Sequence, residues 1–170
     1  MPSPSLVLVL GTGNNSRSQM LHGYLQHLLG PLAHVFSTGL DADGVHPLAV
    51  RVMAEDGVDI AAHTSDRVAH CLHLRFAHVV TVCDHAPWCG WPAAAPGARQ
   101  HHCPVPDPAA GAAGPAPFRA VRDQLKAYAH AFVRAEFAAL FPVAGPTRPP
   151  EDRMRGRAHT NRRTQGERGF

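Results

Sequence analysis

The chain has 170 residues, of which 45% are hydrophobic and 17% are charged, which is enough apolar sequence for one domain with a buried core. This composition excludes a chain that is disordered throughout, and the first apolar run, residues 6–10, is far too short to span a membrane. Because no basic segment precedes that run, we expect no signal peptide, no membrane contact and a cytoplasmic protein.

The net charge of +3 is unevenly distributed along the chain. Residues 142–170 contain seven arginines and three acidic residues, and they are nearly free of large apolar side chains. We therefore predict a domain over residues 1–141 and a basic, disordered tail over residues 142–170. The other 141 residues carry nine basic and ten acidic side chains, which argues against nucleic acid as a partner of the domain. Contact of the tail with an acidic surface stays an alternative.

Short apolar runs alternate with segments whose apolar residues have helical spacing. We predict strands over 5–10, 33–37, 78–82 and near 98–103, helices over 18–29, 47–56 and 118–140, a weaker helix over 65–74, and loops through most of 83–117. This alternation predicts an α/β fold of three layers with a four-stranded parallel sheet.

The loop between the first strand and the first helix is a candidate anion site, because ligands of parallel sheets bind beyond the carboxyl ends of the strands. Small residues let successive backbone N–H groups point inward, the helix adds its positive N-terminus, and an arginine can bind two oxygens of a tetrahedral anion. The predicted oxyanion-binding residues are Gly11, Thr12, Gly13, Asn14, Asn15, Ser16, Arg17 and Ser18.

Three other interpretations of this loop are open. A nucleotide P-loop requires a second glycine followed by lysine, and neither is present. A dinucleotide-binding loop requires a third glycine, where this chain has Ser16. It also requires an acidic residue at the end of the second strand, and none is present there. The third interpretation is an ordinary glycine-rich turn that binds no ligand.

Four cysteines, at positions 71, 83, 89 and 103, favour thiol chemistry or metal binding over a structural disulfide framework in a chain without an export signal. Cys83, His85, Cys89, His101, His102 and Cys103 fall in one loop-rich region and are candidates for binding zinc or trivalent arsenic. Paired zinc-ligand spacing is absent, and scattered surface histidines are the simpler interpretation.

Several stretches in order resemble the thioredoxin-coupled arsenate reductases, which have the low-molecular-weight tyrosine phosphatase fold. The resemblance covers about residues 6–141. The loop of that family reads C-T-G-N-S-C-R-S-Q-M, and residues 11–20 here read G-T-G-N-N-S-R-S-Q-M. Further matches lie at 37–39, 44–47, 59–60, 63–66, 79–83, 107–109 and 121–123.

The chain departs from this family at the two loop cysteines. The resemblance implies a nucleophilic cysteine at position 11, where this chain has glycine, and a second cysteine at position 16, where it has serine. Glycine has no atom that could attack arsenate or a phosphoester, and no base in the sequence neighbours the hydroxyls of Thr12 and Ser16. We therefore expect impaired catalysis, which leaves open whether the protein is an enzyme.

The other catalytic roles that the resemblance implies fall on residues that are present. Arg17 would bind the oxyanion, and Asp107 would be the general acid that protonates the leaving oxygen. Cys83 would attack the arsenic adduct, and Cys89, six residues later rather than the family's seven, would resolve it as a disulfide that thioredoxin reduces. The alternative interpretation is that Cys83 and Cys89 are ordinary thiols and that Asp107 is an exposed aspartate in a turn.

The resemblance implies no required cofactor and one candidate cation, potassium. Asn14, Ser37, Thr64 and Asp66 match the oxygen ligands of the family's potassium site, but the family's helix glutamate is His22 here. An imidazole is a poor ligand for potassium. Hydrogen bonds that hold the loop are the alternative role of these residues.

Three functional hypotheses follow. The first is a pseudoenzyme that binds arsenate or phosphate, which are alike in shape and charge, in the 11–18 loop and reduces arsenate poorly or not at all. The second is an active thiol-dependent arsenate reductase or phosphatase-type enzyme that uses Cys83 and Cys89. The third is a non-catalytic sensor of oxyanion or arsenite that acts through a partner.

Overall fold

The computed structural model describes residues 4–83, 95–111 and 113–140. Its strands are β1 (Ser5–Gly11), β2 (Ala33–Gly39), β3 (His78–Thr81) and β4 (Arg99–His102), and its helices are α1 (Arg17–Leu29), α2 (Pro47–Glu55) and α3 (Pro115–Glu136). Short 3-10 turns occur at Gly30–Leu32, Val68–Cys71 and Ala138–Leu140. No helix among these residues combines the length and the apolar character that a membrane crossing requires. The predicted tail, residues 142–170, lies outside the described residues.

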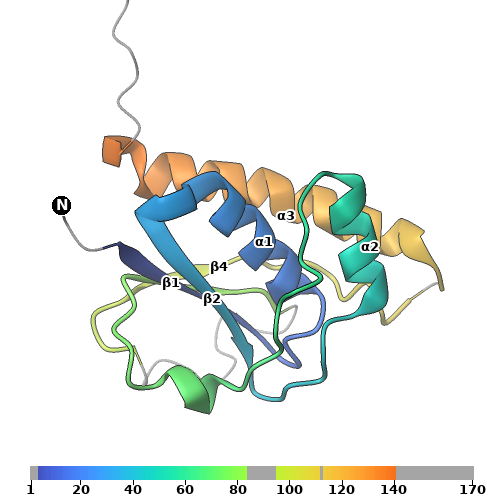
Figure 1. Ribbon diagram of the computed structural model, residues 1–170, viewed down its shortest axis with the longest axis horizontal. Helices are drawn as coiled ribbons and strands as arrows, with labels where there is room; N and C mark the ends of the chain where they lie inside the picture. The colour runs from blue at the N-terminus through green and yellow to red at the C-terminus, as the bar shows by residue number, and fades with distance from the viewer. Residues whose placement is uncertain (1–3, 84–94, 112, 141–170) are drawn as a thin grey trace, which may run out of the picture.

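The four strands form one parallel sheet in the order β2-β1-β3-β4. This confirms the predicted α/β class and the four-stranded parallel sheet. Figure 1 shows α1, α2 and α3 on one side of the sheet. The 3-10 turn at Val68–Cys71 and the neighbouring irregular segments cover the other side and form the third layer.

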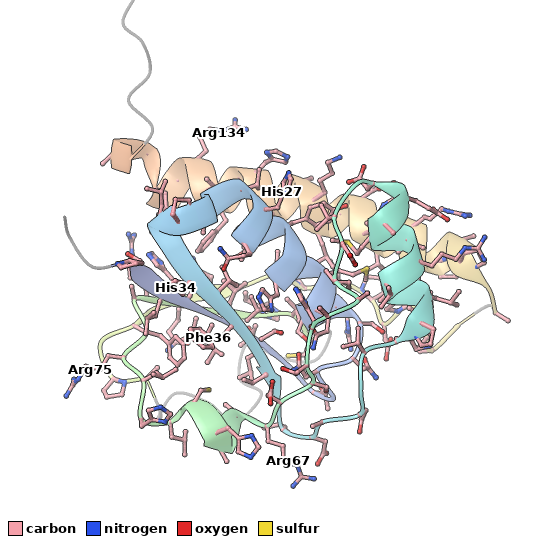
Figure 2. All side chains as sticks on the ribbon, viewed as in Figure 1. His27, His34, Phe36, Arg67, Arg75 and Arg134 are labelled. Carbon is pink, nitrogen blue, oxygen red and sulfur yellow. The ribbon has the colours of Figure 1, made fainter. Side chains whose placement is uncertain are left out.

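Side chains alternate between two apolar cores along the strands because successive strand residues point to opposite faces. On the helical side the core includes Val7, Val9, Val80 and Val82. On the other side it includes Leu8, Leu10, Val79, Cys71 and Phe76. Phe36 of β2 packs there edge to face against Phe76, with ring centroids 5.8 Å apart (Figure 2). Burial on both faces explains why the β1 sequence is continuously apolar.

Two predicted helices differ from those observed. Residues 65–74 form only the short turn at Val68–Cys71, because Cys71 is the one buried residue of this stretch and so small an apolar surface does not stabilise a full helix. The last helix begins earlier than residue 118, with Pro115 in its first turn, where the missing N–H costs nothing. It ends at Glu136, and Phe137 leaves the helix to enter the core.

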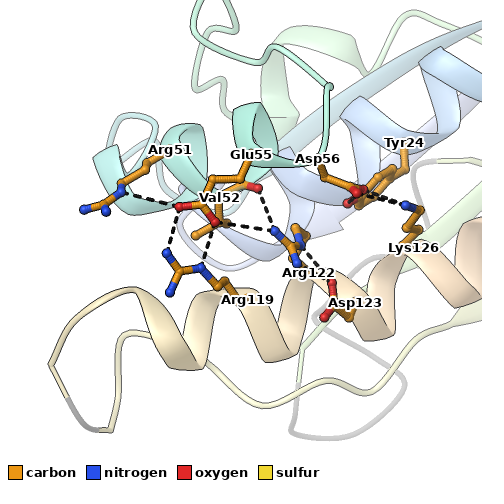
Figure 3. Close-up of polar contacts among 9 residues, drawn as sticks. All are labelled: Tyr24, Arg51, Val52, Glu55, Asp56, Arg119, Arg122, Asp123 and Lys126. Carbon is orange, nitrogen blue, oxygen red and sulfur yellow. Dashed lines mark hydrogen bonds and ion pairs between the residues drawn. The ribbon is translucent and has the colours of Figure 1, made fainter.

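Polar contacts attach α3 to the other two helices (Figure 3). Asp56 accepts hydrogen bonds from Tyr24 Oη at 2.7 Å and from Lys126 Nζ at 3.0 Å. These two donors, Lys126 first, hold the pKa of Asp56 below its ordinary value. Arg119 binds both oxygens of Glu55, at 2.7 and 2.8 Å. Exposed pairs of this kind contribute little each, so the buried Tyr24 hydroxyl is the contact that we expect to matter for stability.

Replacing Tyr24 with phenylalanine should therefore lower the free energy of unfolding by about 1–2 kcal/mol, because it removes a hydrogen bond to a charged group. The matched control is Tyr128→Phe on α3, whose hydroxyl makes no hydrogen bond in the part of the chain that the structure describes. Urea unfolding of the three proteins measures the difference. Equal midpoints for the two variants would contradict this account.

Candidate functional site: the loop after β1

The candidate site lies where β1 ends and α1 begins. Residues 12–16 join Gly11, the last residue of β1, to Arg17, the first residue of α1. Gly11 pairs with Gly39 at the end of β2, so the loop lies at the carboxyl edge of the sheet (Figure 1). Parallel sheets bind their ligands at this edge.

The carbonyl groups of the loop are bound from outside. The distances are 3.0 Å from Thr12 O to Asp41 N, 3.0 Å from Gly13 O to Asp43 N, and 2.8 Å from Asn15 O to His46 N. Asn14 O accepts from Ser65 Oγ at 2.9 Å. By contrast, no backbone N–H of residues 12–16 donates a hydrogen bond within the described residues. A row of unpaired N–H groups beside a helix N-terminus is suited to bind an anion.

Asn14 fixes the path of this loop. Its φ of 46° lies in the left-handed region, which asparagine tolerates better than most residues, and it is 1% exposed. Its Nδ2 donates to Ser37 O at 3.0 Å, while its Oδ1 accepts from Ser18 Oγ at 2.9 Å and from Gln19 Nε2 at 3.1 Å. The side chain thereby connects the loop to β2 and to the first turn of α1.

Arg17 and Asp107 come together although they are distant in sequence. Arg17 Nη1 donates to Val105 O at 3.0 Å, and Arg17 Nη2 lies 3.7 Å from Asp107 Oδ2. Asp107 Oδ1 also accepts from Ala109 N at 3.0 Å, which fixes the carboxylate in its turn. The arrangement places a cation and a carboxyl group, 13% and 37% exposed, next to each other.

Residue 11 has room for only a small side chain. A Cβ built on Gly11 would lie 3.0 Å from Ser18 Oγ and 3.7 Å from Val82 Cγ2. Ser18 is therefore the polar side chain nearest to this position. Ser16, at the second position where the family has cysteine, is buried, and its Oγ makes no hydrogen bond in the described part of the chain.

Cys83 follows β3 at the same edge of the sheet. The preceding residue, Val82, donates its N–H to Leu10 O at 3.0 Å, so this strand end lies beside the start of the loop. Cys83 is 4% exposed and disulfide-bonded, whereas Cys71 and Cys103 are free and buried. Cys89 lies outside the described residues, so its pairing with Cys83 stays a prediction.

The described candidate ligands for zinc or arsenic do not converge on one point. His102 Nδ1 lies 2.8 Å from Thr81 Oγ1, while His101 packs against Phe132 of α3. They therefore point to opposite faces of the sheet, as neighbours in a strand do. Cys103 belongs to the core on the helical side, and burial raises its pKa to about 11, as expected of an unreactive thiol. His85 and Cys89 lie outside the described residues.

The four candidate potassium ligands are brought together, but their geometry does not fit a cation. Asn14 Nδ2 donates to Asp66 O at 3.4 Å as well as to Ser37, and Thr64 Oγ1 donates to Asp66 Oδ2 at 2.5 Å. Asn14 Oδ1 already accepts two hydrogen bonds. Ser37 Oγ lies 2.9 Å from His22 Nδ1. The oxygens that would surround an ion face protein groups instead, and these residues hold the loop by direct hydrogen bonds.

Sequence reasoning missed two further residues that support the loop. Gln19 Nε2 donates to Asn14 O at 3.1 Å and to Thr64 O at 2.9 Å, and Ser65 Oγ donates to Asn14 O at 2.9 Å. Gln19 is fully buried, at 0% exposure. The sequence held a signal for both residues, because Gln19 and Ser65 lie in stretches that match the family, 11–20 and 63–66, but no role in the loop was assigned to them.

Two stacked imidazoles lie beneath this part of the loop. The rings of His22 and His63 are 4.2 Å apart between centroids, and His63 Nδ1 lies 3.0 Å from Gln19 Oε1. Burial, with a smaller contribution from His63, lowers the pKa of His22 from 6.5 to about 3. Burial also lowers the pKa of His63. Both rings are therefore neutral near pH 7.

Gly39 should be essential for the position of the loop. A Cβ there would lie 2.6 Å from Thr12 O and 2.8 Å from Asn14 N, and closer still to Asp41 O. We expect Gly39→Ala to lower the free energy of unfolding by about 1–3 kcal/mol through overpacking and to weaken phosphate binding. Gly111→Ala is the control, because a Cβ there meets nothing within 4 Å. Thermal unfolding and phosphate titration measure both effects, and an unchanged Gly39→Ala protein would contradict them.

The neutral state of His22 predicts a pH dependence of stability. Because its folded-state pKa is below 6.5, the unfolded chain gains the proton first as the pH falls. Stability should be complete above about pH 6.5 and should decrease by about 2 kcal/mol between pH 7 and pH 5. The slope should be smaller in His22→Gln and unchanged in His27→Gln, an exposed histidine of the same helix. Chemical unfolding across this pH range tests it, and equal slopes in all three proteins would refute it.

Comparison with known proteins identifies the family. No protein-family model matches the chain. Arsenate reductase 1 of Staphylococcus epidermidis is 36% identical over 121 residues, which cover 71% of this chain and 89% of the relative. A solved arsenate reductase in its phosphate-binding state is 28% identical, with a TM-score of 0.67, and the match covers 77% of this chain and 98% of that one.

A second solved structure extends the likeness of the fold. The YwlE arginine phosphatase from Geobacillus stearothermophilus is 23% identical with a TM-score of 0.66, and the match covers 81% of this chain and 96% of that one. The fold is thus the one shared by low-molecular-weight phosphatases and arsenate reductases. The identity to the staphylococcal protein over nearly its whole length shows that this chain belongs to the arsenate reductase family.

Proposed function

We propose that this protein binds a tetrahedral oxyanion, arsenate or phosphate, in the loop 11–18 and that its arsenate reductase activity is impaired. The orientation of the loop is the observation that carries the proposal. Its carbonyl groups are bound from outside, and the N–H groups of residues 12–16 donate no hydrogen bond within the described residues. Arg17, which follows these residues, adds a guanidinium that lies 3.7 Å from Asp107 Oδ2.

The impairment follows from the residue at position 11. In the family a cysteine thiolate forms the bond to arsenic, and Gly11 offers no atom for that step. Arg17 can still orient the anion, and Asp107 can still supply a proton, but neither replaces a covalent intermediate. Ser18 stands beside position 11 without a base among its hydrogen-bond partners, which are limited to Asn14 within the described residues.

Loss of the thiolate should not weaken anion binding. A thiolate at the base of the loop would repel a dianion, and two unit charges 4 Å apart interact by about 4 kcal/mol at an effective dielectric constant of 20. Glycine removes that repulsion and leaves the backbone donors in place. We therefore expect binding that is at least as tight as in a protein with the cysteine.

The second candidate is a redox enzyme that works through Cys83 without a loop cysteine. Two observations favour it: Cys83 is disulfide-bonded, and the strand end that carries it is hydrogen-bonded to the start of the loop. The proposed partner of that disulfide is Cys89, and the proposed reductant is thioredoxin, as the family relationship suggests.

We expect isothermal titration calorimetry to detect arsenate and phosphate binding to the wild-type protein, and a thioredoxin-coupled assay to detect little arsenate reduction. Gly11→Cys should recover reductase activity at least tenfold above wild type, because the new side chain needs only a small shift of the Ser18 hydroxyl. Gly11→Ala is the matched control: it adds the Cβ without sulfur, and it should bind anion and stay inactive.

The outcomes separate the two candidates. Reductase activity in the wild-type protein that Cys83→Ser abolishes would favour the Cys83 enzyme and refute the impairment. Wild-type protein that binds neither anion would refute the oxyanion site itself. Inactive Gly11→Cys protein with intact anion binding would show that more than the nucleophile has been lost.

A further inference from the structure

A second group of polar side chains lies between strands β3 and β4 and the end of α3. His78 is the first residue of β3, His101 lies in β4, and Glu136 is the last residue of α3. One ligand atom from each lies within 4.8 Å of the others. His78 Nδ1 is 3.2 Å from His101 Nε2 and 3.8 Å from Glu136 Oε2.

These side chains are enclosed and held in place by aromatic rings. The side chains of His78 and Glu136 are only 9% and 11% exposed. The ring of Phe132 stands edge to face with His78 at 5.5 Å and with His101 at 5.0 Å, and Phe137 lies 5.4 Å from His78. An apolar shell around converging polar atoms is the usual surrounding of a metal site, because it fixes the ligands and excludes solvent.

The spacing of the two nitrogens suits one shared ion. Ligands about 2.0–2.1 Å from a tetrahedral zinc ion lie roughly 3.4 Å from each other, close to the 3.2 Å between His78 and His101. The carboxylate oxygen lies 3.8 Å from His78 and within 4.8 Å of the ligand atom of His101, so it must approach both nitrogens when the ion binds. In the structure these two nitrogens share a hydrogen bond, so one of them carries a proton, which moves to the other nitrogen of its ring or leaves when a metal ion binds.

The carboxylate has a competitor for the ion. Glu136 Oε2 is buried without a hydrogen bond of acceptable geometry, although the guanidinium of Arg99 forms a close ion pair with it. The side chain of Arg99 is 69% exposed, so it can withdraw into solvent when a divalent cation takes its place. Arg99 should therefore oppose binding without preventing it.

We propose that His78, His101 and Glu136 bind a divalent transition-metal ion, with zinc the best match, and that the ion holds the end of α3 against β3 and β4. Two imidazoles and one carboxylate select zinc or cobalt over magnesium or calcium, and water would complete the coordination. The site shares no residue with the oxyanion loop.

Cobalt(II) absorption titration of the full chain, followed by displacement with zinc, tests the proposal. The wild-type protein should develop the visible bands of a nitrogen- and oxygen-bound cobalt ion. Glu136→Gln and His101→Ala should each weaken binding at least tenfold. His130→Ala, an exposed histidine of α3, is the matched control and should bind as the wild type does.

Arg99→Gln should increase the affinity for cobalt several-fold, because it removes the cation that competes for Glu136. A misfolded protein would not show such an increase. Circular dichroism and phosphate titration confirm that each variant is folded, since the loop is remote from these changes. The proposal is overturned by absence of the bands in the wild-type protein. It is equally overturned by cobalt affinity that is the same in wild type, Glu136→Gln and His101→Ala, which would place the ion on other histidines.

Discussion

The outward orientation of the carbonyl groups in the loop after β1 is the constraint on which the candidate site depends. A peptide group points its N–H and its C=O in opposite directions, so donors that bind the carbonyls from outside turn the amides inward. Those donors come from the backbone of Asp41, Asp43 and His46 and from the side chains of Ser65 and Gln19. None of them involves residue 11. The anion cradle is therefore built independently of the side chain that does chemistry in the family, and it can outlast that side chain.

The support beneath the loop is neutral. Asn14, Gln19 and Ser37 form a hydrogen-bonded group with the imidazoles of His22 and His63, and burial keeps these rings uncharged near pH 7. A buried carboxylate in this position would require a counter-ion, whereas a neutral ring satisfies Ser37 directly. The structure thus explains how the loop keeps its path with residues that do not fit potassium.

Sequence reasoning predicted the parts of the fold that local pattern determines. The apolar run that ends at Gly11 and the spacing of apolar residues before Gly30 gave β1 and α1 nearly to the residue. The prediction of a helix over residues 65–74 was wrong, because the spacing of apolar residues does not reveal how much surface the sheet offers for burial. The meeting of Arg17 with Asp107 was expected from the family resemblance alone, since no local rule connects residues so distant in the chain.

The histidines show that residues adjacent in the sequence do not necessarily belong to the same site. His101, His102 and Cys103 are consecutive, which suggested one metal site, but the alternation of a strand turns His102 away from the other two. The partners of His101 are instead His78 and Glu136, which the sheet register and the end of α3 bring to it. Those partners are fixed by packing between elements, which a single sequence does not display. Because this cluster and the oxyanion loop share no residue, ion binding at one requires no change in the charges of the other.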